Sequence, residues 1–361
     1  MHIGMLTGGG DAPGLNAVMR AVVKYGAGQK GWRITGIEDS FNGMFDSPPR
    51  TMEMAPVTCQ GMLQRGGTVL GTTNRGNPFS FPTPAGEVDR SGELAAAIRA
   101  AGMDGLLVIG GDGTQDIGWR LMQTHGIPVV GVPKTIDNDL RATEQTFGFQ
   151  SAVDVATDAL DRLHTTAESH DRVLFLEVMG RDAGHIALHA GISGGADVIL
   201  LPEIPWRPEA VAAKIAARRA RGRPFSLVIV AEGALPDDGS GAQPSAADTA
   251  ARLKAGGGAA HIAMKALEGR VDAEMRICVL GHLQRGGSPV AFDRLLATRF
   301  GVAAVDLVER REWGKMVALR GGRVVSVSLA DATGGIRGID PEGELVRVAR
   351  ATGIELGNGC G

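Results

Sequence analysis

The sequence is poor in cysteine and in aromatic residues, and it has no long apolar run. Its 361 residues include three cysteines, Cys59, Cys278 and Cys360, and 4% aromatic residues. An odd, scattered set of cysteines fits neither a metal site nor a disulfide framework, so we expect a reducing, cytoplasmic compartment. No apolar run approaches the roughly 20 residues that span a bilayer. The amino terminus lacks the basic region of a signal peptide, so we expect none.

Neither sign of charge dominates the chain. The net charge is −3, which excludes a general attraction to nucleic acid or to anionic membranes. With 43% apolar and 21% charged residues, the composition is typical of globular proteins. Glycine is abundant, at 54 residues, so many backbone positions must turn tightly or approach a ligand closely. The length predicts two domains.

Short apolar runs alternate with helical patterns along the chain. We expect strands at 2–7, 32–39, 105–110, 127–132, 172–179, 196–201, 225–232 and 276–281. We expect helices at 14–27, 94–102, 114–125, 150–166, 183–191, 208–220, 248–267 and 291–309, and loops at 75–86 and 234–246. This alternation predicts an α/β fold with two doubly wound, Rossmann-like α/β/α domains and mainly parallel sheets. Ligands should bind just beyond the carboxyl ends of the strands.

Glycine-rich segments follow two of these strands. "TGGGDAPGLN" (7–16) combines adjacent glycines with the start of a helix, which suits a phosphate. The dinucleotide pattern fails because Pro13 replaces the last glycine, and no Walker A motif occurs. A tight strand-to-helix turn without a ligand remains the alternative. "GDGT" (111–114) offers Asp112 to a divalent cation that bridges phosphates. With Gly110 it forms the GGDGT sequence of several kinase families, including NAD kinases and diacylglycerol kinases.

"PKTIDND" (133–139) places a cation, a hydroxyl and two carboxylates directly after an apolar strand. Phosphoryl transfer to a hydroxyl needs a base and positive charge on the transferred group. We interpret Asp137 as the base, Asp139 as an assisting charge and Thr135 as a contact to the transferred group. In an extended segment Asp137 and Asp139 would project the same way. Capping of helix turns by the two aspartates is the alternative.

Later strand ends carry further polar residues. Glu232 could accept hydrogen bonds from sugar hydroxyls, and basic side chains suit a phosphate ester. The basic residues are Arg172, Arg181, Arg276, His282 and Arg285. For any single arginine, a surface ion pair is the alternative. His185 and His189 share one helical face and could bind zinc, but no third ligand is evident.

These motifs together resemble the phosphofructokinase family from residue 1 to about 330. The motifs "TGGGDAPGLNA", "GGDGT", "PKTIDND", "EVMGR" and the segment 276–294 stand in family order and spacing. The resemblance implies transfer of a phosphoryl group to the 1-hydroxyl of fructose 6-phosphate, a glycolytic reaction. It implies a donor domain (1–147 and about 284–335), an acceptor domain (148–283 and about 336–361), and an active site in the cleft between them.

The resemblance also implies roles for individual residues. Asp137 matches the catalytic base, with Asp139, Thr135, Arg181 and Lys134 also in the catalytic set. Asp112 matches the magnesium position. The donor contacts would be Gly10, Arg75, Gly111, Asp112, Gly113 and Thr114. The sugar-phosphate contacts would be Thr135, Asp137, Met179, Gly180, Arg181, Glu232, His282 and Arg285. Arg172 and Arg276 match arginines that reach a neighbouring subunit's site, in what is usually a homotetramer.

The phosphoryl donor is left open between ATP and pyrophosphate. Gly113 is typical of ATP users, because a carboxylate there would repel an α-phosphate, whereas Lys134 is typical of pyrophosphate users. Ile117 replaces a further glycine of bacterial ATP enzymes. We favour ATP because Gly113 removes both the clash and the repulsion. At the family's effector site Arg20 and Lys24 match, but Pro56 replaces an arginine, which argues against ADP activation.

Two other hypotheses explain fewer residues. A different GGDGT kinase, such as an NAD kinase, leaves Arg172, Arg181 and Arg276 without a task. A silent nucleotide-binding regulator predicts loss of the base or of the magnesium aspartate, and both are present. We therefore predict a magnesium-dependent sugar-phosphate kinase.

Overall fold

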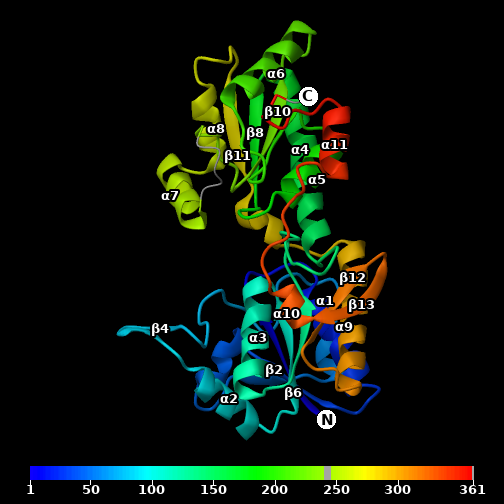
Figure 1. Cartoon of the computed structure of the whole chain (residues 1–361). Coiled ribbons are helices and arrows are strands. Elements are labelled where there is room, and N and C mark those ends of the chain that lie inside the picture. Colours follow the sequence, from blue (N-terminus) through cyan, green and yellow to red (C-terminus); the bar gives the residue numbers. More distant parts are fainter. Residues whose placement is uncertain (240–244, 360–361) are drawn as a thin grey trace. The chain divides into compact units, whose positions relative to one another are not determined.

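The chain forms two compact units in the computed structural model, which describes residues 1–239 and 245–359 (Figure 1). Unit 1 comprises Met1–Ile136, Leu140–Ser151 and Arg285–Ile336. Unit 2 comprises Asp137–Asp139, Ala152–Gln284 and Arg337–Gly361. Part of the expected loop at 234–246, and Cys360, lie outside the described residues. Each unit is built around its own sheet.

Unit 1 contains a seven-stranded sheet in the order β13-β12-β7-β6-β1-β2-β3. Its strands are β1 (His2–Gly8), β2 (Arg33–Ile37), β3 (Thr51–Glu53), β6 (Gly105–Gly110), β7 (Val129–Pro133), β12 (Lys315–Arg320) and β13 (Arg323–Ser328). The five central strands are parallel, and β3 and β13 add antiparallel edges. The carboxyl ends of β1, β6 and β7 therefore lie together at one edge of the sheet.

Helices cover both faces of this sheet (Figure 1). They are α1 (Leu15–Val22), α2 (Ser91–Ala100), α3 (Asp112–His125), α9 (Ala291–Glu309) and α10 (Leu329–Ala332). Successive strand residues point to opposite faces. Met5 of β1 accordingly packs in the core under α1 and α9, whereas Leu6 packs in the core under α2 and α3. The α/β/α layering predicted for this unit is confirmed.

Unit 2 contains a four-stranded, wholly parallel sheet in the order β11-β8-β10-β9. Its strands are β8 (Val173–Val178), β9 (Val198–Leu200), β10 (Ser226–Ala231) and β11 (Met275–Val279). Its helices are α4 (Phe149–His170, which begins in unit 1), α5 (His185–Ser193), α6 (Pro208–Ala220), α7 (Ala246–Gly256), α8 (Ala259–Leu267) and α11 (Glu344–Ala351). Every residue of β9 and β10 is buried, as expected for strands covered on both sides.

Three details differ from the sequence-based expectations. The helix expected at 248–267 is two helices, because Gly257 and Gly258 adopt φ of 78° and 112°. The loop expected at 75–86 includes β4 (Phe81–Thr83), which pairs with β5 (Gly86–Val88) in a hairpin. The strands β3, β12 and β13 were not predicted. The edge strands β3 and β13 are short or largely exposed and lack the apolar run that marks a central strand, whereas β12 is an interior strand whose buried apolar run was missed.

None of the helices formed by residues 1–239 and 245–359 combines the length and the apolarity that a membrane span requires.

Candidate functional site

The loop after β1 binds two cationic side chains in unit 1. Lys134, whose side chain is 3% exposed, donates from Nζ to the carbonyl of Gly10. Arg285 donates from Nη1 to the carbonyl of Asp11 over 3.1 Å. A Cβ at Gly10 would lie 2.7 Å from the same Nη1, so glycine allows this close approach. Two positive charges therefore converge on the loop that the sequence marked as a phosphate site. Arg285, expected at the sugar phosphate, is packed here.

The GGDGT segment turns directly into α3, which begins at Asp112. Thr114 is buried between the ends of β1 and β6, where a Cβ at Gly8 would lie 2.7 Å from its hydroxyl oxygen. The backbone amide of Thr114 donates to the carbonyl of Gly111 over 3.1 Å. Gly113 is exposed, and a Cβ there would meet no heavy atom within 4 Å. The fold itself therefore makes no steric demand for glycine at position 113.

Gln115 fixes this turn and was missed by the sequence analysis. Its side-chain amide donates to the carbonyls of Val108, Gly110 and Val132 over 3.2, 3.1 and 2.9 Å. These carbonyls belong to the ends of β6 and β7, so one fully buried residue ties α3 to both strands. A glutamine one residue after GGDGT carries no sequence signal for this role.

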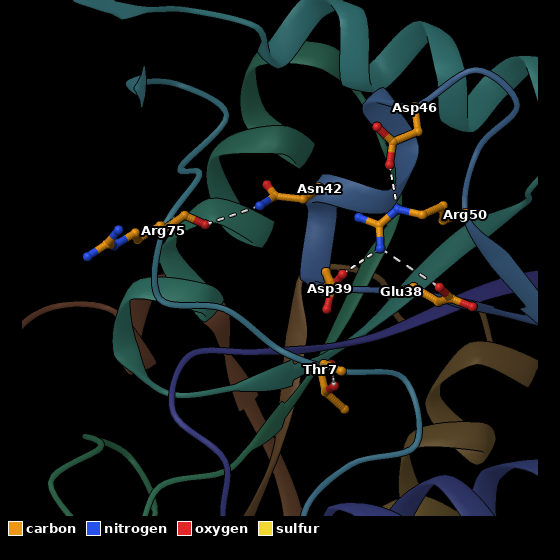
Figure 2. A network of polar contacts seen from close by, with 8 residues as sticks. Thr7, Glu38, Asp39, Asn42, Asp46, Arg50 and Arg75 are labelled. Atoms are coloured by element: carbon orange, nitrogen blue, oxygen red, sulfur yellow. Dashed lines mark hydrogen bonds and ion pairs between the residues drawn. The ribbon is translucent and has the colours of Figure 1, made fainter. Parts of the chain in front are cut away.

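Arg75 lies on a loop beside a surface network of charges (Figure 2). Its carbonyl accepts a hydrogen bond from the side chain of Asn42 over 3.5 Å, and its amide donates to the hydroxyl of Thr73 over 3.0 Å. Arg50 pairs with Asp39 and Asp46, both at 2.5 Å. Figure 2 shows the guanidinium of Arg75 pointing away from this network. Its backbone is thus anchored while its charge stays clear of these carboxylates.

The segment Asp137–Asp139 is grouped with unit 2. The segment is not extended, because Asn138 has a φ of 54°, in the left-handed region. Strand alternation therefore does not relate the two aspartates. The carbonyls of Asn138 and Asp139 instead accept hydrogen bonds from Arg337 of the same unit.

Arg181 lies within electrostatic range of Asp137. Its pKa is raised first by the hydrogen bond that it donates to Asp182 and by the charge of that carboxylate, and then by the negative charges of Glu232 and Asp137. The side chain of Arg181 is 63% exposed, so its guanidinium remains open to a ligand. Three residues predicted for the acceptor site, Asp137, Arg181 and Glu232, are therefore brought together within unit 2.

Backbone contacts explain why these residues meet. The amide of Gly233 donates to the carbonyl of Gly180 over 3.3 Å, and a Cβ at Gly233 would lie 1.8 Å from the carbonyl of Arg181. Gly180 itself has a φ of 125°. Met179 donates from its amide to the side chain of Gln284 over 2.8 Å. The loops after β8 and β10 are thus locked against each other.

Two further predicted acceptor residues, Thr135 and His282, have different surroundings. Thr135 belongs to unit 1 and is buried, and its carbonyl accepts a hydrogen bond from the hydroxyl of Thr146 over 2.7 Å. His282 is exposed on the short turn Gly281–Arg285.

Arg172 and Arg276 share one carboxylate, that of Glu274. Arg172 donates from Nε to Glu274 over 2.6 Å, and Arg276 binds the other oxygen. The hydrogen bond from Arg172 lowers the pKa of Glu274. Sequence reasoning missed Glu274, although its position two residues before Arg276 was a local signal of an ion pair. The two arginines predicted to reach a neighbouring subunit are thus held side by side.

The histidine pair is used in hydrogen bonding to backbone. Nε2 of His185 donates to the carbonyl of Arg337 over 2.9 Å, and His189 hydrogen-bonds through Nδ1 to the carbonyl of His185 over 2.8 Å. Burial lowers the pKa of His185 to about 4. Within residues 1–239 and 245–359, no three His, Cys, Asp or Glu side chains gather as a metal site.

Asp112 fits a magnesium ion that arrives with its substrate. It presents one carboxylate at the amino end of α3. Mg²⁺ in kinases is held by one or two carboxylates together with substrate phosphates and water, so a ready-made protein cage is not required.

Comparison with known proteins identifies the family of this chain. The family model described as Phosphofructokinase matches residues 2–308. The chain is 51% identical to the ATP-dependent 6-phosphofructokinase of Chloroflexus aurantiacus over 99% of this chain and 98% of that protein. It is 48% identical to the pyrophosphate–fructose 6-phosphate 1-phosphotransferase of Streptomyces coelicolor, over 94% of this chain and 97% of that one.

Solved structures are similar in fold. The phosphofructokinase of Pichia pastoris in the T-state aligns with a TM-score of 0.78 and 32% identity, over 92% of this chain and 37% of the yeast chain. The present chain also spans 45% of the phosphofructokinase chain from Saccharomyces cerevisiae, with a TM-score of 0.75. With the family model matching most of its length and relatives about half identical end to end, this chain belongs to the phosphofructokinase family.

Proposed function

We propose that this protein is a magnesium-dependent 6-phosphofructokinase that uses ATP. It transfers the γ-phosphoryl group of ATP to the 1-hydroxyl of D-fructose 6-phosphate and yields fructose 1,6-bisphosphate and ADP. Unit 1 is the donor domain and unit 2 the acceptor domain. The proposal is supported above all by the acceptor cluster of Asp137, Arg181 and Glu232. The cluster supplies a base, a cation and a carboxylate that can accept hydrogen bonds from sugar hydroxyls.

In the proposed mechanism Asp137 accepts the proton of the 1-hydroxyl while the oxygen of that hydroxyl bonds to the γ-phosphorus. The bond from that phosphorus to the β,γ-bridging oxygen breaks, and ADP leaves with the electron pair. Arg181 neutralises charge on the transferred group, and Glu232 accepts hydrogen bonds from the sugar hydroxyls. Thr135 contacts the transferred group, and Asp139 supports the base electrostatically. Magnesium held by Asp112 would neutralise charge on the donor phosphates.

The donor is bound by the residues of unit 1. Gly10, Gly111, Gly113 and Thr114 shape the phosphate loop, and Arg75 supplies a guanidinium that lies clear of the Arg50 network. ATP is favoured because Gly113 is open: nothing in the fold would meet a side chain there, so the space is available for an α-phosphate.

Pyrophosphate is the second candidate donor. Lys134 is almost fully buried beside the Gly10 carbonyl, where an ammonium group could meet a phosphate leaving group. Relatives of nearly equal identity carry names for each donor.

We further propose a homotetramer with shared active sites. Arg276 is 61% exposed, and the apolar side chains of Val279 and Leu283 nearby in sequence are 51% and 68% exposed. Arg172 and Arg276 would complete the 6-phosphate pocket of a neighbouring subunit, with Met179, Gly180, His282 and Arg285 as further sugar-phosphate contacts.

A coupled assay with fructose 6-phosphate and either ATP or pyrophosphate tests the proposal. We expect saturable turnover with MgATP and much weaker turnover with pyrophosphate. Turnover with pyrophosphate alone would overturn the choice of donor. Absence of transfer to fructose 6-phosphate from either donor would overturn the function.

A further inference from the structure

The segment Arg337–Ile339, which follows the last residue of unit 1, is bound to the Asp137–Asp139 segment of unit 2. The amide of Arg337 donates to the carbonyl of Asp139 over 2.7 Å. Its guanidinium donates from Nη2 to the carbonyl of Asn138 over 2.5 Å. One residue near the carboxyl end of the chain therefore binds the carbonyls of the two residues that follow Asp137.

Two other side chains of unit 2 also bind the segment Arg337–Ile339. His185 donates from Nε2 to the carbonyl of Arg337 over 2.9 Å. Glu203 accepts from the amides of Ile339, at 2.8 Å, and of Gly184, at 3.0 Å. Burial raises the pKa of Glu203, whereas these backbone amides lower it. The segment is thus tied both to the start of α5 and to the turn that follows β9.

The conformation of Asn138 explains why such a clamp is needed. A φ of 54° is uncommon for a residue with a side chain, and a sparsely populated conformation persists only where the surroundings fix it. The carbonyl that follows this φ accepts the Arg337 guanidinium, and the next carbonyl accepts the Arg337 amide. Arg337 therefore fixes the peptide on the carboxyl side of the strained residue.

We propose that Arg337 is a positioning residue for the base Asp137, an inference that rests on the proposed function. Its guanidinium holds the turn at Asn138, so the Asp137 carboxylate is presented in one orientation to the acceptor hydroxyl. A displacement of about 1 Å at a reacting group can cost up to roughly 100-fold in rate. Loss of this clamp should therefore lower kcat more than it raises the KM for fructose 6-phosphate.

Three variants of the full-length protein test the role. Arg337→Ala removes the guanidinium, and Arg337→Lys retains a cation and a donor for the Asn138 carbonyl. Arg347→Ala is the matched control, since Arg347 is exposed on α11. We expect Arg337→Ala to lower kcat by about 10- to 100-fold with a change in KM below about threefold. Arg337→Lys should recover part of the loss, and Arg347→Ala should behave as the wild type.

Hydrogen exchange provides a readout that does not depend on activity. In Arg337→Ala, amides of a peptide covering 136–141 should exchange faster than in the wild type and in Arg347→Ala. Wild-type kcat in Arg337→Ala, or unchanged exchange in that peptide, would overturn the positioning role. A wild-type protein without transfer to fructose 6-phosphate would overturn the proposed function, and the exchange experiment would still decide whether the clamp exists.

Discussion

The residues around the predicted phosphate loop of unit 1 and the predicted sugar-phosphate arginines of unit 2 are held in different ways. In unit 1, Lys134 is buried on a backbone carbonyl, Thr114 is wedged between two strand ends, and Gln115 binds three carbonyls. In unit 2, Arg181 and Arg276 are 63% and 61% exposed and are paired with Asp182 and Glu274. Lys134 and Gln115 are fixed by backbone carbonyls, whereas these two arginines rest on neighbouring carboxylates.

This difference has a physical consequence for binding. A buried amide or ammonium group that is bound to carbonyls keeps its geometry without a ligand. Binding of the phosphoryl donor therefore orders few additional side chains and costs little conformational entropy. An exposed ion pair is weak and easily exchanged, because water and salt screen it. A phosphate ester can therefore replace Asp182 or Glu274 as the partner of an arginine at modest cost. The acceptor side should be sensitive to salt, and the donor side much less so.

The largest effect should come from removing the base that the acceptor unit supplies. Asp137→Ser should lower kcat by roughly 10²–10⁴-fold, because no other group would accept the hydroxyl proton. Steady-state kinetics with MgATP measures the loss. Asp154→Ser, at an exposed position on α4, is the control and should retain wild-type kcat. A variant at position 137 with nearly unchanged kcat would show that the base is another group.

A negative charge at position 113 tests whether the open space there in unit 1 selects ATP as the phosphoryl donor. Gly113→Asp should lower kcat/KM for ATP by about 100-fold, since like charges placed together at a binding site cost several kcal/mol. The melting temperature should stay near that of the wild type, because the fold leaves the position open.

Gly113→Asn serves as the neutral isostere of that variant. Its kcat/KM for ATP should fall less than that of Gly113→Asp. The difference between the two variants measures the effect of the negative charge alone. Equal losses would mean that shape, not repulsion, selects the donor.

Removal of an acceptor arginine should give a smaller, salt-dependent effect. Arg276→Ala should raise the KM for fructose 6-phosphate by roughly 10-fold, the loss of one charge-assisted contact, and leave the KM for ATP nearly unchanged. The wild-type KM for fructose 6-phosphate should rise with ionic strength, and the rise should be shallower in the variant. A parallel change in both KM values would contradict the division between the units.

Replacement of His185 should have the smallest effect on activity, but it should change how the free energy of unfolding depends on pH. Burial lowers the pKa of His185 from 6.5 to about 4. Between these values the unfolded chain binds a proton that the folded protein does not, so stability is full above pH 6.5 and falls as pH drops toward 4. The contribution is on the order of 3 kcal/mol.

His185→Gln should therefore flatten the pH dependence of the free energy of unfolding between pH 4 and 6.5, measured by urea denaturation. His261→Gln, which removes an exposed histidine, is the control. Curves with the same slope for wild type and His185→Gln would show that folding leaves the pKa of His185 unchanged.

Much of the central architecture was predictable from sequence. Buried parallel strands such as Gly105–Gly110 are continuous apolar runs, and their ends were marked by glycine and charged residues, so the sequence located the GGDGT and PKTIDND segments. The edge strands and the break at Gly257–Gly258 were not predictable, because exposed strands and glycine turns carry little periodic signal.

Local composition determined which residues could do phosphoryl-transfer chemistry, because strand ends and glycine turns are encoded over a few neighbouring positions. Only the tertiary structure decided how those residues are held. The contacts that Arg337 makes with the Asn138 and Asp139 carbonyls join positions about 200 residues apart. Glu274 between its two arginines, and Gln115 across the ends of two strands, likewise depend on backbone carbonyls and charges whose proximity no local pattern encodes.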